Sequence, residues 1–267
     1  MSKDEILYHY CSNEVLIKIL SGKQLRLSCL HSANDYMEGG WIIEKLKNEL
    51  ASGMDGFLSP DIDSKLNFYR ENLLGFVSCF SKEEDLLSQW RGYGNNGKGV
   101  AVGFNRKKLD STFSGFTFGK LVDVEYRERE QDKFLKSWIR DAEKVMKKIK
   151  VGKANKDDSD NHIREFLEEI YSYKNPAFKE EREVRLIMLS PLEAAHSDLW
   201  GERVELSCKD DLITPYIDIG FSNLMMNLVE KIVIGPKNTS SQRQLEFWLK
   251  AKGYSKTEVC TSKATYR

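Results

Sequence analysis

Several features are scarce or missing in this sequence of 267 residues, and each absence excludes a class of protein. No apolar run approaches the roughly 20 residues that a membrane-spanning helix needs, so we expect no contact with a membrane. The first ten residues lack the apolar segment of a secretory signal. The five cysteines are odd in number and widely spaced, which predicts no disulfide framework. We therefore expect a cytoplasmic protein in a reducing environment.

The chain also lacks an excess of charge of either sign. It has 41 Lys and Arg residues against 41 Asp and Glu residues, so global basicity gives no argument for binding nucleic acid. A hydrophobic fraction of 40% and an aromatic fraction of 11% are typical of a folded globular protein. The length allows one large domain or two small ones. We interpret residues 1–267 as a single domain.

Strand-like and helix-like segments alternate irregularly along the chain. This order predicts a mixed α+β fold with flanking helices rather than a doubly wound sheet. Apolar residues recur at spacings of three and four around Trp138 and again around Phe166, which predicts two amphipathic helices packed as a hairpin. We expect them to form a helical insertion at about residues 128–173, joined by a mobile connection at 153–161.

The predicted strands are residues 6–10, 25–28, 75–81, 99–104, 121–126, 181–189, 203–207, 212–219, 231–234 and 258–262. The other predicted helices run from residue 12 or 13 to 20, over 41–50, 63–74 and 85–90, and from 240 or 241 to 249. We expect the strands at 99–104 and 121–126 to pair with each other.

The predicted strand at residues 181–189 has an unusual pattern of charge. It follows the break that Asn175 and the next proline impose on the preceding helix. Because side chains alternate faces in a strand, Glu181, Glu183 and Arg185 share one face. The second half is apolar on both faces, which predicts a central, buried strand with the charges at the rim of the core. An alternative is that Arg185 only bridges two carboxylates and keeps the strand end soluble.

Residues 92–98 match two phosphate-binding patterns, G-x-G-x-x-G and G-x-x-x-x-G-K. Both patterns need a strand before the glycines and a helix after them, whereas the order here is inverted. Gly99 also stands where the phosphate loop needs Ser or Thr. We therefore predict a turn whose backbone approaches another segment closely. Just before it, Gln89, Trp90 and Tyr93 combine an amide with two aromatic rings, of which Trp90 is the more typical of a core.

Two pairs of conceivable zinc ligands occur at strand spacing, His9 with Cys11 and Cys29 with His31. Cysteine is commonly a small buried residue, and structural zinc ligands rarely come from the interior of strands, so we expect no metal site. A Ser-His-Asp triad has no anchor, because no G-x-S-x-G motif occurs. The run of lysines at residues 144–153 is typical of a solvated helix face.

Six short segments follow one another in a specific order along nearly the whole chain. They are YHYCS, SANDYMEG, SCFSKEEDLLSQWRGYG, GVAVGF, FKEEREVRLI and VIGP, with a terminal strand ending in Tyr266 and Arg267. Together they resemble a bacterial family, the proteins of domain of unknown function 2971 (DUF2971). The resemblance implies an accessory or defence-associated bacterial protein and gives no mechanism.

A looser resemblance is to ADP-ribosyltransferases. These enzymes use a histidine on the first strand, an aromatic residue or a serine on a following strand, and a glutamate, often within Glu-x-Glu, on a late strand. His9, the pair Ser78 and Ser81, and Glu181 with Glu183 match these positions in chain order. The resemblance implies a split, mixed and mainly antiparallel sheet that forms a cleft, with NAD as the cofactor. The separation between the elements is longer here, and a helical insertion precedes the last strand.

The same resemblance implies roles for the matching residues. Glu183 would hold a ribose hydroxyl and the cationic sugar, Glu181 would activate or orient the acceptor, and Arg185 would keep the carboxylates ionised or bind pyrophosphate. His9 would hydrogen-bond the adenosine ribose, and Tyr93 would stack on nicotinamide. The other candidate cofactor-binding residues are Tyr10, Ser28, Asn34, Asp35, Glu38, Ser78, Ser81, Gln89 and Trp90.

These residues predict an ADP-ribosyltransferase-like enzyme that uses NAD, as a toxin or anti-phage effector with a protein or nucleic acid as acceptor. One alternative is a non-enzymatic sensor in which the same cluster recognises a nucleotide or a protein. Another is a metal-dependent nuclease built on Asp35, Glu181 and Glu183. The nuclease lacks the lysine that usually lies beside such carboxylates, and Arg185 would substitute for it.

Overall fold

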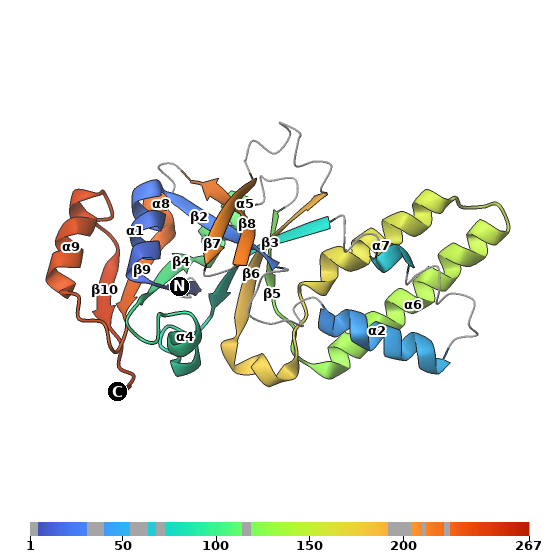
Figure 1. The fold of residues 1–267 in the computed structure, drawn as a ribbon, viewed down its shortest axis with the longest axis horizontal. Coiled ribbons are helices and arrows are strands. Elements are labelled where there is room, and N and C mark those ends of the chain that lie inside the picture. The colour runs from blue at the N-terminus through green and yellow to red at the C-terminus, as the bar shows by residue number, and fades with distance from the viewer. Residues whose placement is uncertain are drawn as a thin grey trace.

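The computed structural model describes residues 5–30, 40–53, 64–67, 73–113, 119–191, 204–209, 212–221 and 225–266. Ten strands in this part of the chain form one open, mixed sheet flanked by helices, which confirms the predicted α+β class (Figure 1). The strands are β1 (Ile6–Cys11), β2 (Gln24–Cys29), β3 (Leu73–Ser81), β4 (Val100–Asn105), β5 (Gly119–Asp123), β6 (Glu183–Pro191), β7 (Val204–Lys209), β8 (Leu212–Gly220), β9 (Val229–Ile234) and β10 (Glu258–Thr261). The helices are α1 (Asn13–Gly22), α2 (Gly40–Gly53), α4 (Leu87–Gly92), α5 (Arg106–Phe113), α6 (Glu128–Lys150), α7 (Lys156–Ile170), α8 (Met225–Leu228) and α9 (Gln242–Ala251), with a 3-10 helix at Pro176–Glu181.

The sheet splits beside β3. Its strand order is β10-β9-β4-β1-β3-β2-β8-β7, and β6 and β5 are added along the second edge of β3. On that edge β6 pairs with β3 along the whole strand, whereas on the other edge β2 pairs only at Phe76 and Val77 and β1 only at Ser81. β1 and β2 therefore separate beside residues 78–80. All pairings are antiparallel except that of β9 with β10.

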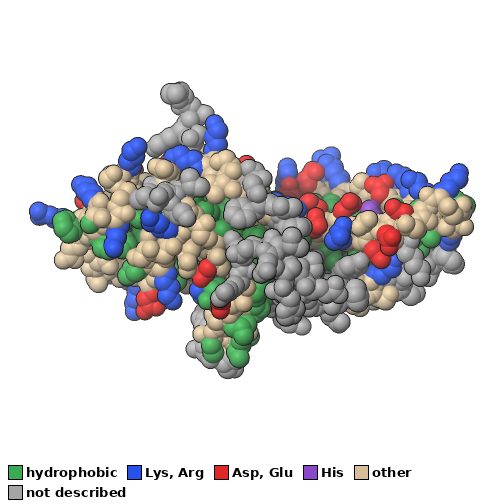
Figure 2. Space-filling view, turned by 90° about the horizontal axis from the view of Figure 1, so that it is seen from above, with side chains coloured by type: hydrophobic (Ala, Val, Ile, Leu, Met, Phe, Trp, Pro, Cys, Tyr) green, Lys and Arg blue, Asp and Glu red, His purple; other side chains and the backbone are tan. Residues whose placement is uncertain are grey.

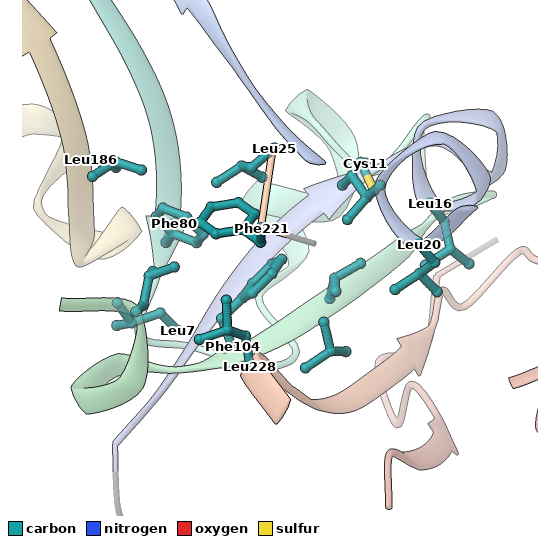
Figure 3. Packing of buried hydrophobic residues seen from close by; sticks show 14 of the residues in the cluster. Leu7, Cys11, Leu16, Leu20, Leu25, Phe80, Phe104, Leu186, Phe221 and Leu228 are labelled. Carbon is teal, nitrogen blue, oxygen red and sulfur yellow. The ribbon is translucent and has the colours of Figure 1, made fainter. Parts of the chain in front are cut away.

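Apolar side chains cover both faces of the sheet. The larger core gathers side chains from β1, α1, β2, β3, β4 and β6 on one face (Figure 3). The second core lies on the other face, where α2, α6 and α7 pack, with Leu135 and Phe166 among its members. Leu186 of β6 belongs to the first core and Ile187 to the second, so the predicted central position of this strand, between β3 and β5, is confirmed.

Helices α6 and α7 form an antiparallel hairpin that extends from the sheet, with α2 alongside (Figure 1). They occupy the position predicted for the helical insertion, between β5 and β6. Over this end of the molecule Lys and Arg side chains are interspersed with Asp and Glu (Figure 2), and Lys144 pairs with Asp141 on α6. The lysine run therefore lies on a mixed, solvated helix face. None of the described helices is long and apolar enough to cross a membrane.

Two predicted connections are wrong. β5 pairs with β6 and not with β4, because α5 leads the chain away from β4 to the far side of the sheet's branch. The predicted mobile connection at 153–161 is largely helical, since α7 begins at Lys156. Asn155 and Asp158 form a capping box there, in which each side chain accepts a backbone N–H of the other residue.

The predicted helix at residues 63–74 differs as well. Residues 64–67 are helical, but Leu73 and Leu74 already belong to β3. Helical and extended periodicity cannot be separated in a short apolar run, and pairing with β6 decides the conformation here.

The glycine-rich turn after α4 approaches β1 closely, as predicted. A Cβ atom at Gly99 would lie 2.1 Å from the carbonyl oxygen of Cys11 and 2.9 Å from that of Gly94. Gly97 has a φ of +81°, in the left-handed region that favours glycine. A helix precedes this turn and β4 follows it, the reverse of the order that a phosphate-binding loop requires.

Replacing Gly99 by alanine is expected to lower the free energy of unfolding by about 1–3 kcal/mol, the usual cost of forcing atoms into a packed region. The new methyl group would overlap the Cys11 carbonyl, so β1 and β4 would have to move apart. Denaturant unfolding measures the difference. Gly92→Ala is the matched control, because a Cβ there meets nothing within 4 Å and alanine is favoured in a helix. Equal stability of G99A and the wild type would contradict the close approach.

Candidate active site

The chain enters β6 through a tight turn. A 3-10 helix, Pro176–Glu181, begins after Asn175, whose side chain accepts a hydrogen bond from the N–H of Ala177 at 2.9 Å. Arg182 then takes a left-handed conformation with a φ of 45°. The strand therefore begins at Glu183, and the prediction that Glu181 lies within it is wrong. The turn nevertheless keeps the Glu181 side chain beside that of Glu183.

Four charged side chains form a buried cluster at this point. Nζ of Lys174 lies 2.7 Å from Oε2 of Glu181 and 3.1 Å from Oε2 of Glu183. Arg185 binds Glu183 with two N–H groups, Nε to Oε1 at 2.8 Å and Nη2 to Oε2 at 3.0 Å. Its Nη1 donates to the carbonyl of Tyr171 at 2.8 Å. The four residues are between 0% and 8% exposed, and their formal charges cancel.

The two carboxylates differ in proton affinity. Burial by itself would raise the pKa of Glu183, but Arg185, Lys174 and the thiol of Cys79 stabilise its anion and lower the pKa to about 2. Burial raises the pKa of Glu181, and its contact with Lys174 offsets this only in part. Glu183 is therefore a fixed negative charge, whereas Glu181 can exchange a proton. Two neighbouring carboxyl groups whose pKa values are shifted in opposite directions are typical of acid–base chemistry.

His9 lies where the sheet splits. Its Nδ1 is 2.9 Å from the carbonyl oxygen of Cys79 on β3. A carbonyl oxygen only accepts, so Nδ1 carries the proton and the neutral ring keeps Nε2 as an acceptor. Burial lowers the pKa of His9, and the hydrogen bond to Cys79 opposes this. The imidazole is therefore neutral at physiological pH.

A small hollow of about 60 Å³ brings the predicted residues together. It lies between β1, β3, α4 and the start of β6. The residues that line it are His9, Tyr10, Cys79, Phe80, Gln89, Tyr93, Glu181 and Glu183. Six of these eight are residues that the sequence predicts for a site. The N-terminal histidine and the late pair of acids thus lie at one concave place.

Two of the three candidate aromatic residues are part of the framework. The hydroxyl of Tyr10 donates to the carbonyl of Glu83 at 2.7 Å and accepts the N–H of Leu86 at 3.0 Å. Trp90 is fully buried and donates its indole N–H to Asp85 at 2.7 Å. Its ring packs edge-on against Tyr10, with ring centroids 4.7 Å apart. Trp90 does not line the hollow, and the prediction that it contacts a ligand is not supported by its position.

Tyr93 is the aromatic residue that a ligand can reach. Its residue surface is 42% exposed, compared with 5% for Tyr10 and 0% for Trp90. Burial of its phenol raises the pKa of Tyr93, and the nearby carboxylate of Glu181 raises it further. Tyr93 therefore offers an uncharged ring at the edge of the hollow.

The predicted serines have different positions. The hydroxyl of Ser81 donates to the carbonyl of Glu181 at 2.7 Å and accepts the N–H of Glu83 at 3.1 Å, so Ser81 holds the backbone that carries Glu181. Ser78 is buried on β3, on the same face as Phe76 and Phe80 of the larger core, and Ser28 is exposed on β2. Neither of these two lines the hollow. Three further predicted residues, Asn34, Asp35 and Glu38, lie outside the described residues.

Lys174 is the functional candidate that sequence reasoning misses. It is 5% exposed and contacts both carboxylates, so the prediction that no lysine lies beside Glu181 and Glu183 is wrong. Lys174 directly precedes Asn175, and nothing in the sequence distinguishes it from the other Lys and Arg residues, which number 41 in total. The sequence offers one weak indication, which is that Lys174 lies between an apolar helix and a proline turn, a place where a side chain is easily buried. Sequence reasoning also misses Cys79, because only the pairing of β3 with β6 brings this residue to the hollow.

Metal ligation has few candidates in the described part of the chain. No group of three or more His, Cys, Asp and Glu side chains there could hold a metal ion. Cys11 and Cys29 are buried in the larger core, and burial raises the pKa of Cys11 to about 12, which disfavours a thiolate ligand. His31, the fourth residue of the conceivable zinc set, lies outside the described residues.

Comparison with known proteins yields one match. The model of the family described as protein of unknown function (DUF2971) matches residues 89–186. No curated protein and no solved structure matches the chain, so the likeness to ADP-ribosyltransferases stays a prediction. The matched region holds Gln89, Tyr93 and the whole charged cluster, and His9 lies outside it. The resemblance to the DUF2971 family that the sequence predicts is thus confirmed over residues 89–186.

Proposed function

We propose that this protein is an enzyme that uses NAD and transfers its ADP-ribose group. The observation that supports this best is the meeting of His9 from β1 with Glu181 and Glu183 from the start of β6 around one hollow. These residues are far apart in the sequence but line the same hollow as the exposed ring of Tyr93. Such a set matches the chain order of an ADP-ribosyltransferase, an argument by analogy.

The chemistry of NAD suits the two carboxylates. Breaking the bond between nicotinamide and ribose develops positive charge on the sugar, as in glycoside hydrolysis. Glu183, ionised at any physiological pH, supplies a fixed negative charge that favours this state. Glu181, with its raised pKa, takes a proton from the acceptor. Nicotinamide leaves as a neutral molecule while the acceptor oxygen or nitrogen bonds to the ribose carbon.

The other residues have supporting roles in this proposal. Tyr93 stacks on the nicotinamide ring, and the free Nε2 of His9 accepts a hydrogen bond from a ribose hydroxyl. Arg185 keeps Glu183 ionised and does not bind pyrophosphate, because it is fully buried and its N–H groups are engaged within the protein. The acceptor is a protein or a nucleic acid, and the role is that of a toxin or anti-phage effector.

A second candidate is a binding module without turnover. It is favoured by the full pairing of both acids, since Lys174 and Arg185 already neutralise Glu181 and Glu183. A hollow of about 60 Å³ is also smaller than the roughly 300–1,000 Å³ usual for a whole small-molecule site. NAD would therefore place only one end inside. The alternative of a metal-dependent nuclease stays a prediction, since its third acid, Asp35, lies outside the described residues.

The proposal is tested with NAD labelled in the nicotinamide ring, incubated with the purified protein and a cell extract. We expect release of free labelled nicotinamide that depends on the presence of the extract, because the ADP-ribose group needs an acceptor. Binding of NAD without release would favour the sensor module. Cleavage of added nucleic acid that a chelator abolishes would favour the nuclease. If the protein neither releases nicotinamide from NAD nor binds NAD, the NAD proposal is wrong.

A further inference from the structure

Gln89 is a largely buried polar residue whose side chain holds no part of the fold through a hydrogen bond. It lies in α4, is 8% exposed and lines the hollow. Its backbone carbonyl accepts the N–H groups of Tyr93 and Gly94, but its side-chain amide makes no hydrogen bond to any described residue. The amide is not sealed off from solvent: in the described part of the chain, the fully enclosed side-chain atoms without a partner are the hydroxyls of Ser78, Ser88 and Ser172. The amide of Gln89 is therefore open to a hydrogen-bonding partner that enters the hollow.

The chemistry of an amide narrows the choice of that partner. A glutamine side chain offers one carbonyl acceptor and two N–H donors in one plane, which matches a primary carboxamide through two parallel hydrogen bonds. A carboxylate would meet Glu181 and Glu183 in the same hollow and would leave the glutamine carbonyl without a donor. Carboxamide recognition satisfies both groups of Gln89.

The size of the hollow also selects a small planar group. Its volume of about 60 Å³ is far below the roughly 300–1,000 Å³ of a whole small-molecule site, so it admits a small group rather than a whole ligand. This is enough for the three heavy atoms of a carboxamide and too little for a nucleobase. An attached ring would remain at the edge, where Tyr93 is 42% exposed. Ring stacking there, with centroids about 4.5–7 Å apart, favours an aromatic carrier.

We propose that Gln89 recognises a primary carboxamide carried on an aromatic ring, with the carboxamide inside the hollow and the ring on Tyr93. This rests on the proposed function in one respect, that the natural carrier is the nicotinamide end of NAD. Gln89 then selects the amide form of the ring over the acid form. It is a specificity-determining residue and takes no part in proton transfer.

The test uses nicotinamide, benzamide, nicotinic acid, benzoate and propionamide as probes, titrated into the full-length protein by calorimetry. We expect the two aromatic amides to bind at least ten-fold more tightly than the two acids and than propionamide. Gln89→Met, which keeps the length of the side chain, is expected to weaken nicotinamide at least ten-fold and to remove the preference. Gln244→Met on the exposed surface of α9 is the matched control and keeps wild-type binding. If Gln89→Met does not fold, Gln89→Glu takes its place, with the same expected loss.

The outcomes separate this inference from the proposed function. If Gln89→Met still turns over NAD and still prefers amides to acids, the proposed enzymatic function stands and the role of Gln89 is overturned. Amide binding that depends on Gln89, without turnover of NAD, supports the inference and overturns the enzyme. Equal affinity for propionamide and benzamide would overturn the aromatic carrier and indicate the side chain of Asn or Gln as the source. No binding of any amide overturns the inference.

Discussion

Replacing Glu183 by glutamine is expected to lower the free energy of unfolding by about 3–5 kcal/mol, the usual cost of removing one partner from a buried ion pair. The substitution leaves the guanidinium of Arg185, which is fully buried, without its carboxylate. Lys174 loses one of its two anionic partners as well. Denaturant unfolding at neutral pH measures the difference from the wild type.

Glu181→Gln is the matched comparison for this prediction. It is the same substitution at the other carboxylate of the cluster, but burial already raises the pKa of Glu181, so a neutral side chain is tolerated there. Lys174 keeps Glu183 as its partner. We expect a loss of less than about 1 kcal/mol. Equal losses in the two variants would mean that Arg185 does not hold Glu183 as the structure shows.

The pH dependence of stability gives a second measurement of the same ion pair. The pKa of Glu183 falls from its ordinary value of 4.5 to about 2 on folding, and one pKa unit corresponds to about 1.4 kcal/mol, so ionisation of Glu183 contributes about 3 kcal/mol. A depressed acid pKa stabilises the fold above pH 4.5, and this contribution is lost as the pH falls toward 2. Glu183→Gln lacks it at every pH. The difference in stability between the two proteins should therefore shrink between pH 4.5 and pH 2.

Glu181→Gln is expected to lower the rate of nicotinamide release from NAD by about 10²–10⁴-fold, the usual contribution of a general acid or base. The variant keeps its fold, as argued above, so the loss reports on chemistry. Glu180→Gln is the matched control, because Glu180 lies in the same 3-10 helix and is exposed to solvent. It should retain the wild-type rate. Wild-type turnover by Glu181→Gln would remove Glu181 from the mechanism.

The pH profile of turnover supplies a readout that a merely structural role would not change. If Glu181 accepts a proton from the acceptor, it has to be ionised, so the wild-type rate rises with pH through the raised pKa of this residue. That rise should lie above pH 4.5, the ordinary value for a glutamate. The residual activity of Glu181→Gln should show no such rise. A flat wild-type profile from pH 4.5 upward would contradict the assignment.

Much of the fold follows from local patterns in the sequence. Alternation of apolar residues predicts β1, β2 and β6 nearly as they are, and spacings of three and four predict α6 and α7. The errors occur where local patterns compete. Apolar residues 73 and 74 fit a helix or a strand, and only the pairing of β3 with β6 decides between them. The partner of β5 is also invisible locally, because the chain can turn either way after α5.

The candidate site is predictable in its residue types and less so in its geometry. The sequence Glu-x-Glu-x-Arg indicates a charged strand entrance, and His9 on the first strand indicates a second component. The left-handed Arg182, which moves Glu181 out of the strand, has no sequence signal beyond the preceding turn. The choice among three aromatic residues likewise depends on packing, which buries Trp90 and leaves Tyr93 exposed.

The sequence by itself determined the approximate positions of most strands and helices, that a buried strand carries charge at its entrance, and that the glycine-rich turn is not a phosphate loop. Only the tertiary structure decided that Lys174 contacts both Glu181 and Glu183, and that His9 lines the same hollow as Glu183. It also decided that Ser28 and Ser78 lie away from this hollow. The reason is physical. Local structure depends on neighbours a few residues away, whereas this site depends on strand pairings such as Tyr8 with Ser81 and Ser81 with Glu183, whose partners lie 73 and 102 positions apart.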